Sequence, residues 1–385
     1  MKSIIYLDNN ATTPLDKRAL DEMMPFLTEQ YANASSSHSF GRKINEAIKN
    51  SRTQIADLIC CDSNEITFTS GATESINIAL KGVADSYRNK GCHIITLSTE
   101  HPAVLDTCKY LETIGYEVSY LPVQNDGIVD LNILNQSLRD DTILVCAMFV
   151  NNETGVIQPI KEISQIAHSK GALFITDGTQ GVGKMTINVD ELGIDLLCFS
   201  SHKFYGPKGV GGLYIRSNSS DKIKISPQVH GGKQEKGLRS GTLNVPSIIG
   251  FGAAAAIAKK EIESDERRIK EIRDYFENEL LKIENTFLNG NSVKRLYNVS
   301  NICFKGVEAE SIIEGLKNIM VSNGSACSSS IIEASHVLMA MGLKNDDAFS
   351  SIRFSLGRFT TKNEIETVLT DLKVLLTSLR NIAIS

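Results

Sequence analysis

The chain reads SSHKFYGPKG from Ser200 to Gly209, directly after the apolar run DLLCF of residues 195–199. The apolar run is typical of a buried strand, so Lys203 stands just beyond a strand end and ahead of a Gly-Pro turn. Most lysines are solvated surface residues. A lysine in this setting also suits a Schiff base with pyridoxal phosphate. Lys203 is therefore a candidate cofactor lysine if other segments supply the rest of such a site.

A second apolar run, LFITD, ends on Asp177 and is followed by a turn. A carboxylate at the end of a strand can pair with a pyridinium nitrogen and make the ring an electron sink. Such an aspartate can equally cap a following helix. Because open α/β sheets bind ligands beyond the carboxyl ends of their strands, Asp177 and Lys203 are predicted to lie at one such edge.

The segment ITFTSGATES indicates a strand, a glycine turn and then a helix. Its small residues would let the backbone N–H groups of Ala72 and Thr73 approach a phosphate at the helix start. The same letters also fit an ordinary helix start capped by Ser70. Ser200 and His202, just before the candidate lysine, could add hydroxyl and imidazole donors to the same phosphate. The ordered set of parts favours a phosphate site.

Polar segments follow two more predicted strands, TEHPA with His101 and NNETG with Asn152. A histidine at such a point could stack on a cofactor ring and move protons near neutral pH, although His before Pro is also common in loops. Asn152 could bond to the ring hydroxyl or a substrate carboxylate, although asparagines in turns often serve the backbone. The recurrence of polar tips on successive apolar strands favours the functional interpretation.

Strand-like apolar runs alternate with helical segments through the first two thirds of the chain. This pattern is typical of an α/β fold with a mostly parallel sheet covered on both faces. We expect a large domain over residues 13–260, built on a seven-stranded sheet. The predicted strands are residues 66–70, 93–97, 117–121, 142–150, 173–177, 196–200 and 212–215.

The remaining third predicts a smaller α+β domain over residues 261–385. Residues 250–284, rich in Ala, Lys, Glu and Ile, are typical of long helices leaving the large domain. Short strands are predicted at 297–304 and 350–354. The final segment opens on a capping box, TKNE, and continues with apolar residues at helical spacing.

Cys327 lies in VSNGSACSSS, a run of small polar residues that predicts a loop. A loop cysteine is exposed enough to act as a nucleophile, whereas most cysteines are buried and inert. Three others fall in apolar strand-like runs and are predicted to be packing residues: Cys146, Cys198 and Cys303. The adjacent pair Cys60-Cys61 has no second cluster at metal-ligand spacing, so no zinc site is predicted.

Together these motifs resemble the class V aminotransferase-fold enzymes, and within them the cysteine desulfurases of the NifS/IscS type. The resemblance extends from Tyr6 to Thr360 and covers nearly the whole chain. It implies pyridoxal-phosphate transferase fold type I, with the first dozen residues, 1–12, packed onto the small domain. The matching motifs are YLDNNATTP, FTSGATES, TEHPAV, NNETGV, TDGTQGVGK, SSHKFYGPKG, HGGKQEKGLRSGT, SNGSACSS and SIRFSLGRFT.

The resemblance implies a role for each matching residue. Lys203 would be the lysine that binds pyridoxal phosphate covalently, and Asp177 the partner of the pyridinium nitrogen. Gln180 would donate to the ring hydroxyl, and His101 would stack on the ring as an acid–base residue.

The same resemblance implies anchors for the phosphate and the substrate. The phosphate ligands would be Thr73, Ser200, His202 and, from the other subunit of a homodimer, Thr242. Arg353 would hold the substrate carboxylate, assisted by Asn152, because an arginine fork offers two parallel charge-assisted bonds. The active site would then lie between the domains and at a dimer interface.

The implied reaction converts L-cysteine to L-alanine while the Cys327 thiolate takes the sulfur as a persulfide. The acceptor would be a protein such as an iron–sulfur scaffold or a thiolation enzyme. Two alternatives stay open: a selenocysteine lyase or other class V lyase, and a non-catalytic sulfur-relay subunit. The sequence does not choose between iron–sulfur assembly, nitrogenase maturation, tRNA thiolation and DNA phosphorothioation.

Composition fits a soluble two-domain enzyme, with 385 residues, 42% hydrophobic residues and a net charge of −5. Neither a membrane span nor a signal peptide is predicted, and the mild acidity argues against direct nucleic-acid binding. Eight cysteines without a disulfide framework indicate a reducing cytoplasm. Four positions depart from the family pattern: Ala34, Gly178, Ser201 and Lys233.

Overall fold

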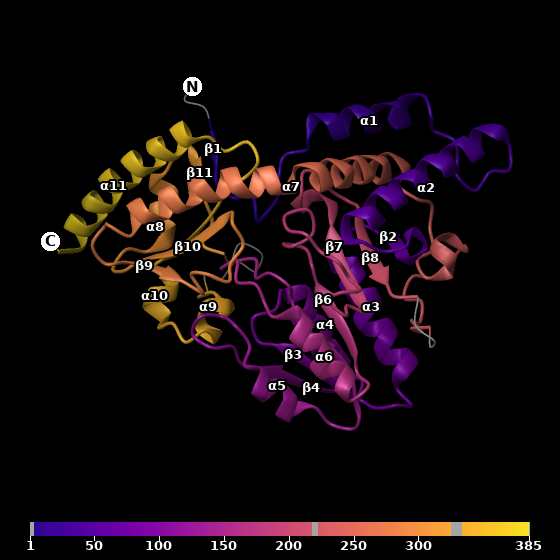
Figure 1. The fold of residues 1–385 in the computed structure, drawn as a ribbon. Coiled ribbons are helices and arrows are strands. Elements are labelled where there is room, and N and C mark those ends of the chain that lie inside the picture. Colours follow the sequence, from indigo (N-terminus) through magenta and orange to yellow (C-terminus); the bar gives the residue numbers. More distant parts are fainter. Residues whose placement is uncertain (1–3, 218–221, 325–332, 385) are drawn as a thin grey trace.

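The computed structural model describes residues 4–217, 222–324 and 333–384 (Figure 1). Within these ranges seven strands form the central sheet, in the order β2-β8-β7-β6-β5-β3-β4. β8 is antiparallel to both neighbours and the other pairs are parallel, which confirms the predicted mostly parallel sheet. The strands are β2 (Ile66–Thr69), β3 (His93–Leu97), β4 (Glu117–Leu121), β5 (Thr142–Cys146), β6 (Leu173–Asp177), β7 (Leu196–Ser200) and β8 (Gly211–Ile215).

Helices cover both faces of this sheet. Successive strand residues point to opposite faces, and here both faces carry apolar side chains that pack against helices. Along β7, Leu196 and Cys198 pack in one apolar cluster, whereas Leu197 and Phe199 pack in the other. The first cluster contains α3 and α4, and the second contains α2, α6 and α7. The helices are α1 (Lys17–Thr28), α2 (Ser39–Ile59), α3 (Ala72–Tyr87), α4 (Pro102–Thr113), α5 (Leu131–Ser137), α6 (Ile160–Ser169) and α7 (Val245–Leu280).

The predicted packing cysteines are confirmed as buried: Cys146, Cys198 and Cys303. One predicted strand, residues 142–150, is shorter in the structure. β5 ends at Cys146, and Val150 forms an isolated bridge with Ile157.

A smaller sheet with strand order β12-β10-β9 follows α7 in the chain, and all its pairs are antiparallel. Strand β9 was not predicted, because it is a four-residue edge strand with Phe287 exposed on it. The predicted capping box is confirmed, since Thr361 and Glu364 exchange side-chain and backbone hydrogen bonds. The elements are β9 (Thr286–Asn289), β10 (Val299–Phe304), α8 (Ala309–Gly315), β11 (Ile319–Met320), α9 (His336–Ala340), α10 (Asn345–Phe349), β12 (Ser351–Ser355) and α11 (Lys362–Ile384).

The two sheets are joined by α7 and by the N-terminal segment (Figure 1). Where long helices were predicted, α7 is one unbroken helix of 36 residues. Strand β1 (Ile5–Tyr6) pairs in parallel with β11, and Asp8 bridges to Ser355 of β12. The domain limits at residues 12 and 260 stay predictions, since α7 runs across the second of them. No helix in the described ranges is long and apolar enough to cross a membrane.

Candidate active site

A cavity of about 490 Å³ opens at the carboxyl ends of β5, β6 and β7. This edge was predicted to carry the site. Ten predicted site residues line the cavity together: Ala72, Thr73, His101, Asn152, Asp177, Gln180, Ser200, His202, Lys203 and Arg353. The structure therefore gathers side chains that lie up to 281 residues apart in the sequence.

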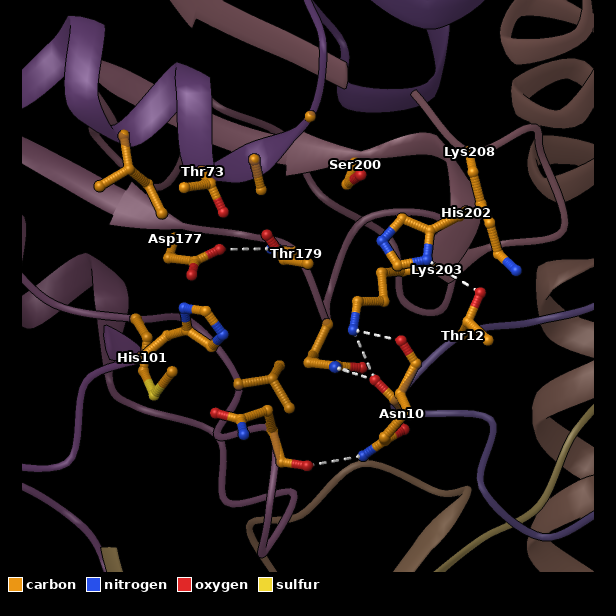
Figure 2. Close-up of a pocket in the computed structure, with 18 of the residues that line it drawn as sticks. Asn10, Thr12, Thr73, His101, Asp177, Thr179, Ser200, His202, Lys203 and Lys208 are labelled. Atoms are coloured by element: carbon orange, nitrogen blue, oxygen red, sulfur yellow. Dashed lines mark hydrogen bonds between the residues drawn. The ribbon is translucent and has the colours of Figure 1, made fainter. Parts of the chain in front are cut away.

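Lys203 ends a short 3-10 turn, Ser201–Lys203, that follows β7 directly. Its Nζ donates hydrogen bonds to the backbone carbonyls of Asn10, at 2.7 Å, and Ala11, at 2.9 Å. Figure 2 shows Lys203 beside Asn10, with Asp177 and His101 across the hollow. The N-terminal segment YLDNNATTP thus forms one wall of the cavity next to the candidate lysine.

Asp177 and His101 occupy the wall opposite Lys203 (Figure 2). Asp177 is the last residue of β6, and its Oδ1 accepts from the Thr179 N–H at 2.9 Å. His101 caps α4, where its Nδ1 accepts from the Ala103 N–H at 3.1 Å, so a neutral imidazole carries its proton on Nε2. Burial lowers the pKa of His101, and the positive charge of Lys203 lowers it further against the opposing effect of Asp177. The ring is therefore neutral near pH 7.

The predicted phosphate cradle surrounds the start of α3. Gly71 is the N-cap and provides no side-chain cap, which corrects the alternative of a helix capped by Ser70. The Ser70 N–H instead donates to Glu74 Oε2 at 2.6 Å, and Glu74 is paired with Arg239. The helix start is thus left open toward Thr73 and the neighbouring side chains of Ser200, His202 and Lys208 (Figure 2).

Arg353 and Asn152 meet at the side of the cavity formed by the smaller sheet. Arg353 lies on β12, and its Nη1 donates to the Asn152 carbonyl at 3.0 Å. Its Nη2 donates to Asp8 Oδ1 at 2.7 Å. Within the described ranges, the buried Arg353 Nε and Asn152 Oδ1 make no hydrogen bond. Both unpartnered atoms are available to a polar ligand.

Two predicted site residues are not part of this cavity as the structure describes it. Thr242 is exposed and lines a separate hollow with Phe26 and Tyr31. Cys327 lies outside the described residues, although Gly324, three positions earlier, lines the cavity. Other lining residues were not predicted: Asn10, Thr12, Glu74, Thr179 and Lys208. Each of these residues lies within a motif that was already matched to the family, so the sequence could have indicated them. The motifs are YLDNNATTP, FTSGATES, TDGTQGVGK and SSHKFYGPKG.

The sequence matches the family model "Aminotransferase class-V" over residues 5–368. The chain belongs to the class V aminotransferase family. It is 51% identical over 387 aligned residues to cysteine desulfurase IscS of Buchnera aphidicola subsp. Baizongia pistaciae (strain Bp), covering 100% of this chain and 95% of that protein. The resemblance to NifS/IscS-type cysteine desulfurases is therefore confirmed.

Solved structures of this family have the same fold. A NifS-like protein matches with a TM-score of 0.91 and 36% identity, covering 98% of this chain and 100% of the other. A structure of SspA in complex with cysteine matches with a TM-score of 0.81 and 35% identity, covering 93% and 100% of the two chains. Fold type I is thereby confirmed for this protein.

Members of this family depend on pyridoxal phosphate, and the cavity fits that cofactor. A dianionic phosphate suits the open start of α3 with its surrounding hydroxyl, imidazole and ammonium donors. Asp177 offers a carboxylate to a ring nitrogen, and Lys203 offers an amine to the aldehyde. An added Cβ on Gly71 would meet only Ser200 Oγ at 3.6 Å, so this side of the cradle is open.

Proposed function

We propose that this enzyme is a cysteine desulfurase that forms L-alanine from L-cysteine and carries the sulfur as a persulfide on Cys327. The single observation that carries this assignment is the placement of Gly324. This residue lines the same cavity as Lys203 and Arg353 and precedes Cys327 by three positions. A thiol so close in sequence to the substrate pocket distinguishes sulfur transfer from other class V reactions. The 51% identity to a cysteine desulfurase supports the same activity.

In this proposal, Lys203 would bind the aldehyde of pyridoxal phosphate and Asp177 would bind the ring nitrogen. When bound, pyridoxal phosphate supplies an electron sink for the pair released at the substrate Cα. The negative charge of the Asp177 carboxylate would favour a proton on the ring nitrogen. The phosphate would be held by Ala72, Thr73, Ser200 and His202.

Proton transfer at the substrate is assigned to two groups of this chain. Lys203 Nζ lies on one wall of the cavity and His101 lies on the opposite wall (Figure 2). A neutral imidazole can accept a proton near pH 7, which burial of His101 favours by lowering its pKa. Lys203 Nζ would take the proton from the substrate Cα. His101 would transfer protons at the side of the substrate that carries Cβ and the sulfur.

Arg353 would orient the substrate through its carboxylate, and Asn152 through its ammonium group. The guanidinium is almost fully buried, so a charge-assisted bond to a carboxylate is stronger there than in water. The unpartnered Arg353 Nε would donate to the substrate carboxylate, and the unpartnered Asn152 Oδ1 would accept from the substrate ammonium group.

Sulfur transfer balances without an added oxidant. The Cys327 thiolate attacks the substrate sulfur, a sulfur–sulfur bond forms, and the carbon–sulfur bond breaks. The electron pair of the broken bond remains with the three-carbon fragment, which gains protons and leaves as L-alanine. L-Cysteine and one thiol thus become L-alanine and one persulfide.

The assignment is tested by a cysteine-to-alanine assay on purified enzyme that carries its cofactor. We expect Cys327→Ser to abolish alanine formation while keeping the visible absorbance of the cofactor, and Lys203→Ala to lose both. Cys60→Ser is the matched control, because Cys60 is an exposed cysteine outside the cavity, and it should be unaffected. Full alanine formation by Cys327→Ser would contradict the assignment of the persulfide to Cys327.

A homodimer explains the position of Thr242. Thr242 is exposed in its own chain, and the neighbouring helix α1 exposes apolar Leu20, Met24 and Leu27. A second copy packed on this face would bury these side chains and bring Thr242 to the partner's phosphate cradle. Sedimentation should show a dimer that Leu27→Glu weakens, with loss of cofactor affinity, whereas Val374→Glu on α11 should have no effect. A monomeric wild-type enzyme with full activity would contradict the proposal.

The persulfide sulfur is proposed to pass to a protein acceptor, such as an iron–sulfur scaffold or a thiolation enzyme. Transfer of ³⁵S from labelled cysteine to a candidate acceptor tests this directly. Label that stays on Cys327 in the presence of each candidate would exclude those acceptors.

A further inference from the structure

Lys184 is a buried lysine directly behind the cavity wall. It ends the motif TDGTQGVGK, and its residue is only 4% exposed. Its Nζ donates to Gln180 Oε1 at 2.7 Å and to Asn10 Oδ1 at 3.3 Å. Lysines are almost never this buried without an acidic partner. Among the described residues, however, no carboxylate lies within ion-pair distance of Lys184, so its partners are amide oxygens.

The surroundings of Lys184 disfavour its charged form. Burial is the main cause that lowers the pKa of Lys184 well below the usual range, and the positive charges of Lys203 and Arg353 lower it further. Whether neutral or charged, the amine presents N–H donors. The Gln180 side-chain oxygen is therefore always paired with a donor on this side.

The other end of the Gln180 amide faces Lys203. Gln180 Nε2 donates at 2.9 Å to the Asn10 carbonyl, and the same carbonyl accepts from Lys203 Nζ at 2.7 Å. The two donors share one acceptor, so the Gln180 NH₂ group lies beside the Lys203 amine. In pyridoxal phosphate the ring hydroxyl is on the carbon next to the one that bears the aldehyde. A donor beside the lysine amine is therefore correctly placed for that oxygen.

A flipped Gln180 amide would place its oxygen against the Asn10 carbonyl oxygen, with no proton between the two acceptors. It would also lose the hydrogen bond that Lys184 Nζ donates to Gln180 Oε1. The hydrogen bond between Gln180 Oε1 and Lys184 Nζ involves neither Lys203 nor the Asn10 carbonyl to which Lys203 donates. This hydrogen bond therefore persists when Lys203 binds the cofactor.

We propose that Lys184 is a positioning residue that fixes the amide orientation of Gln180 and thereby presents an N–H donor to the ring hydroxyl oxygen of pyridoxal phosphate. This inference rests on the proposed binding of the cofactor at Lys203. Lys184 does not line the cavity itself and acts through Gln180, with Asn10 as its second anchor.

The backbone brings Lys184 to this point through the turn before it. Gly183 has φ +76°, and an added Cβ there would lie 2.5 Å from the Phe204 ring. The turn therefore packs directly against the residue that follows Lys203. This close approach couples the position of the Lys184 backbone to that of the Lys203 loop.

The test measures the visible absorbance of the bound cofactor as a function of pH. A donor at the ring hydroxyl oxygen stabilises the form in which that oxygen is negative and the Lys203 nitrogen carries no proton. Loss of the donor should raise the pH midpoint of the band by about 0.5–1 unit, the equivalent of one hydrogen bond. The other charged or titratable groups around the cavity are Glu74, His101, Asp177, His202, Lys208 and Arg353.

Lys184→Met removes the amine and keeps most of the side-chain volume. We expect it to raise the midpoint, and Gln180→Ala to raise it as well. If Lys184 acts through Gln180, the double variant should show no further shift beyond that of Gln180→Ala. Met185→Ala is the control, because it loosens the same turn without removing the amine, and it should leave the midpoint unchanged.

Two results would overturn the inference. One is an unchanged pH midpoint in Lys184→Met, and the other is a midpoint shift of Lys184→Met that adds fully to that of Gln180→Ala. If Lys184→Met does not fold, Lys184→Gln retains an N–H donor on a shorter chain and should shift the midpoint in the same direction by less. A wild-type enzyme without any visible band would instead overturn the proposed function.

Discussion

Arg353 binds Asp8 through one arm of its guanidinium, with Nη2 and Oδ1 2.7 Å apart. The pair joins strand β12 to the N-terminal segment and holds the arginine at the cavity before any substrate enters. A buried charge held by a partner keeps its orientation and avoids being left unpaired. In the proposed function, the substrate carboxylate would therefore meet a preorganised cation.

Arg353→Lys should raise the KM for L-cysteine by roughly 10- to 100-fold with a smaller change in kcat, because a lysine retains the charge but not the planar fork. Steady-state alanine formation at varied cysteine concentration measures both constants. Arg358→Lys is the matched control, since Arg358 is a similarly buried, ion-paired arginine outside the cavity. A KM that rises equally in both variants would mean that the effect comes from general destabilisation.

Glu153 connects the site to both described ends of the segment that contains Cys327. Its Oε2 accepts from Ser335 Oγ at 2.5 Å, and an added Cβ on Gly324 would lie 2.5 Å from the same oxygen. Glu153→Ala should lower the free energy of unfolding by about 2–4 kcal/mol, because it leaves a void and removes the oxygen to which the Ser335 hydroxyl donates. It should also reduce alanine formation more than cofactor affinity.

Glu153→Gln is the control for this prediction, since it keeps the volume and an acceptor oxygen. Urea unfolding and cofactor titration of both variants separate stability from binding. If Glu153→Ala and Glu153→Gln lose stability and alanine formation equally, the charge of Glu153, rather than its contact with Ser335, determines both properties.

The strand ends of the large sheet could be predicted from the sequence because each apolar run stops at a polar residue. Lys203 and Asp177 were predicted in this way, the resemblance added Gln180 and Arg353, and all four line the cavity. Asn10 was missed because its main contact with Lys203 uses a backbone carbonyl 193 residues away, which no side-chain pattern reports. Thr242 could not be placed for a different reason: its predicted partner belongs to a second copy of the chain.

Ser201 is one of the four departures from the family pattern, and the structure gives it no polar partner. Its Oγ is buried and makes no hydrogen bond to any residue in the described ranges. Ser201→Ala should therefore leave stability unchanged or raise the free energy of unfolding by roughly 0–1 kcal/mol. Thermal unfolding of the cofactor-free protein measures this. Thr13→Val is the contrast, because Thr13 Oγ1 bonds both the His202 carbonyl and the Tyr205 N–H, and it should destabilise.

His202 predicts how the stability of the cofactor-free protein depends on pH. Burial lowers the pKa of His202 to about 4, helped by the positive charges of Lys203 and Lys208. An unfolded histidine titrates near 6.5, so between about pH 6.5 and 4 the unfolded chain binds more protons than the folded one. The contribution of His202 is therefore present above pH 6.5 and is lost as the pH falls toward 4.

His202→Gln should make the free energy of unfolding less dependent on pH over this window, by at most one proton in the slope. His93 and His101 also have lowered pKa values, so part of the dependence should remain. Urea unfolding at several values between pH 7 and pH 5, in wild type and variant, gives the two slopes. Identical slopes would show that His202 titrates in the folded protein as it does in the unfolded chain, and would remove burial as the determinant of its charge state.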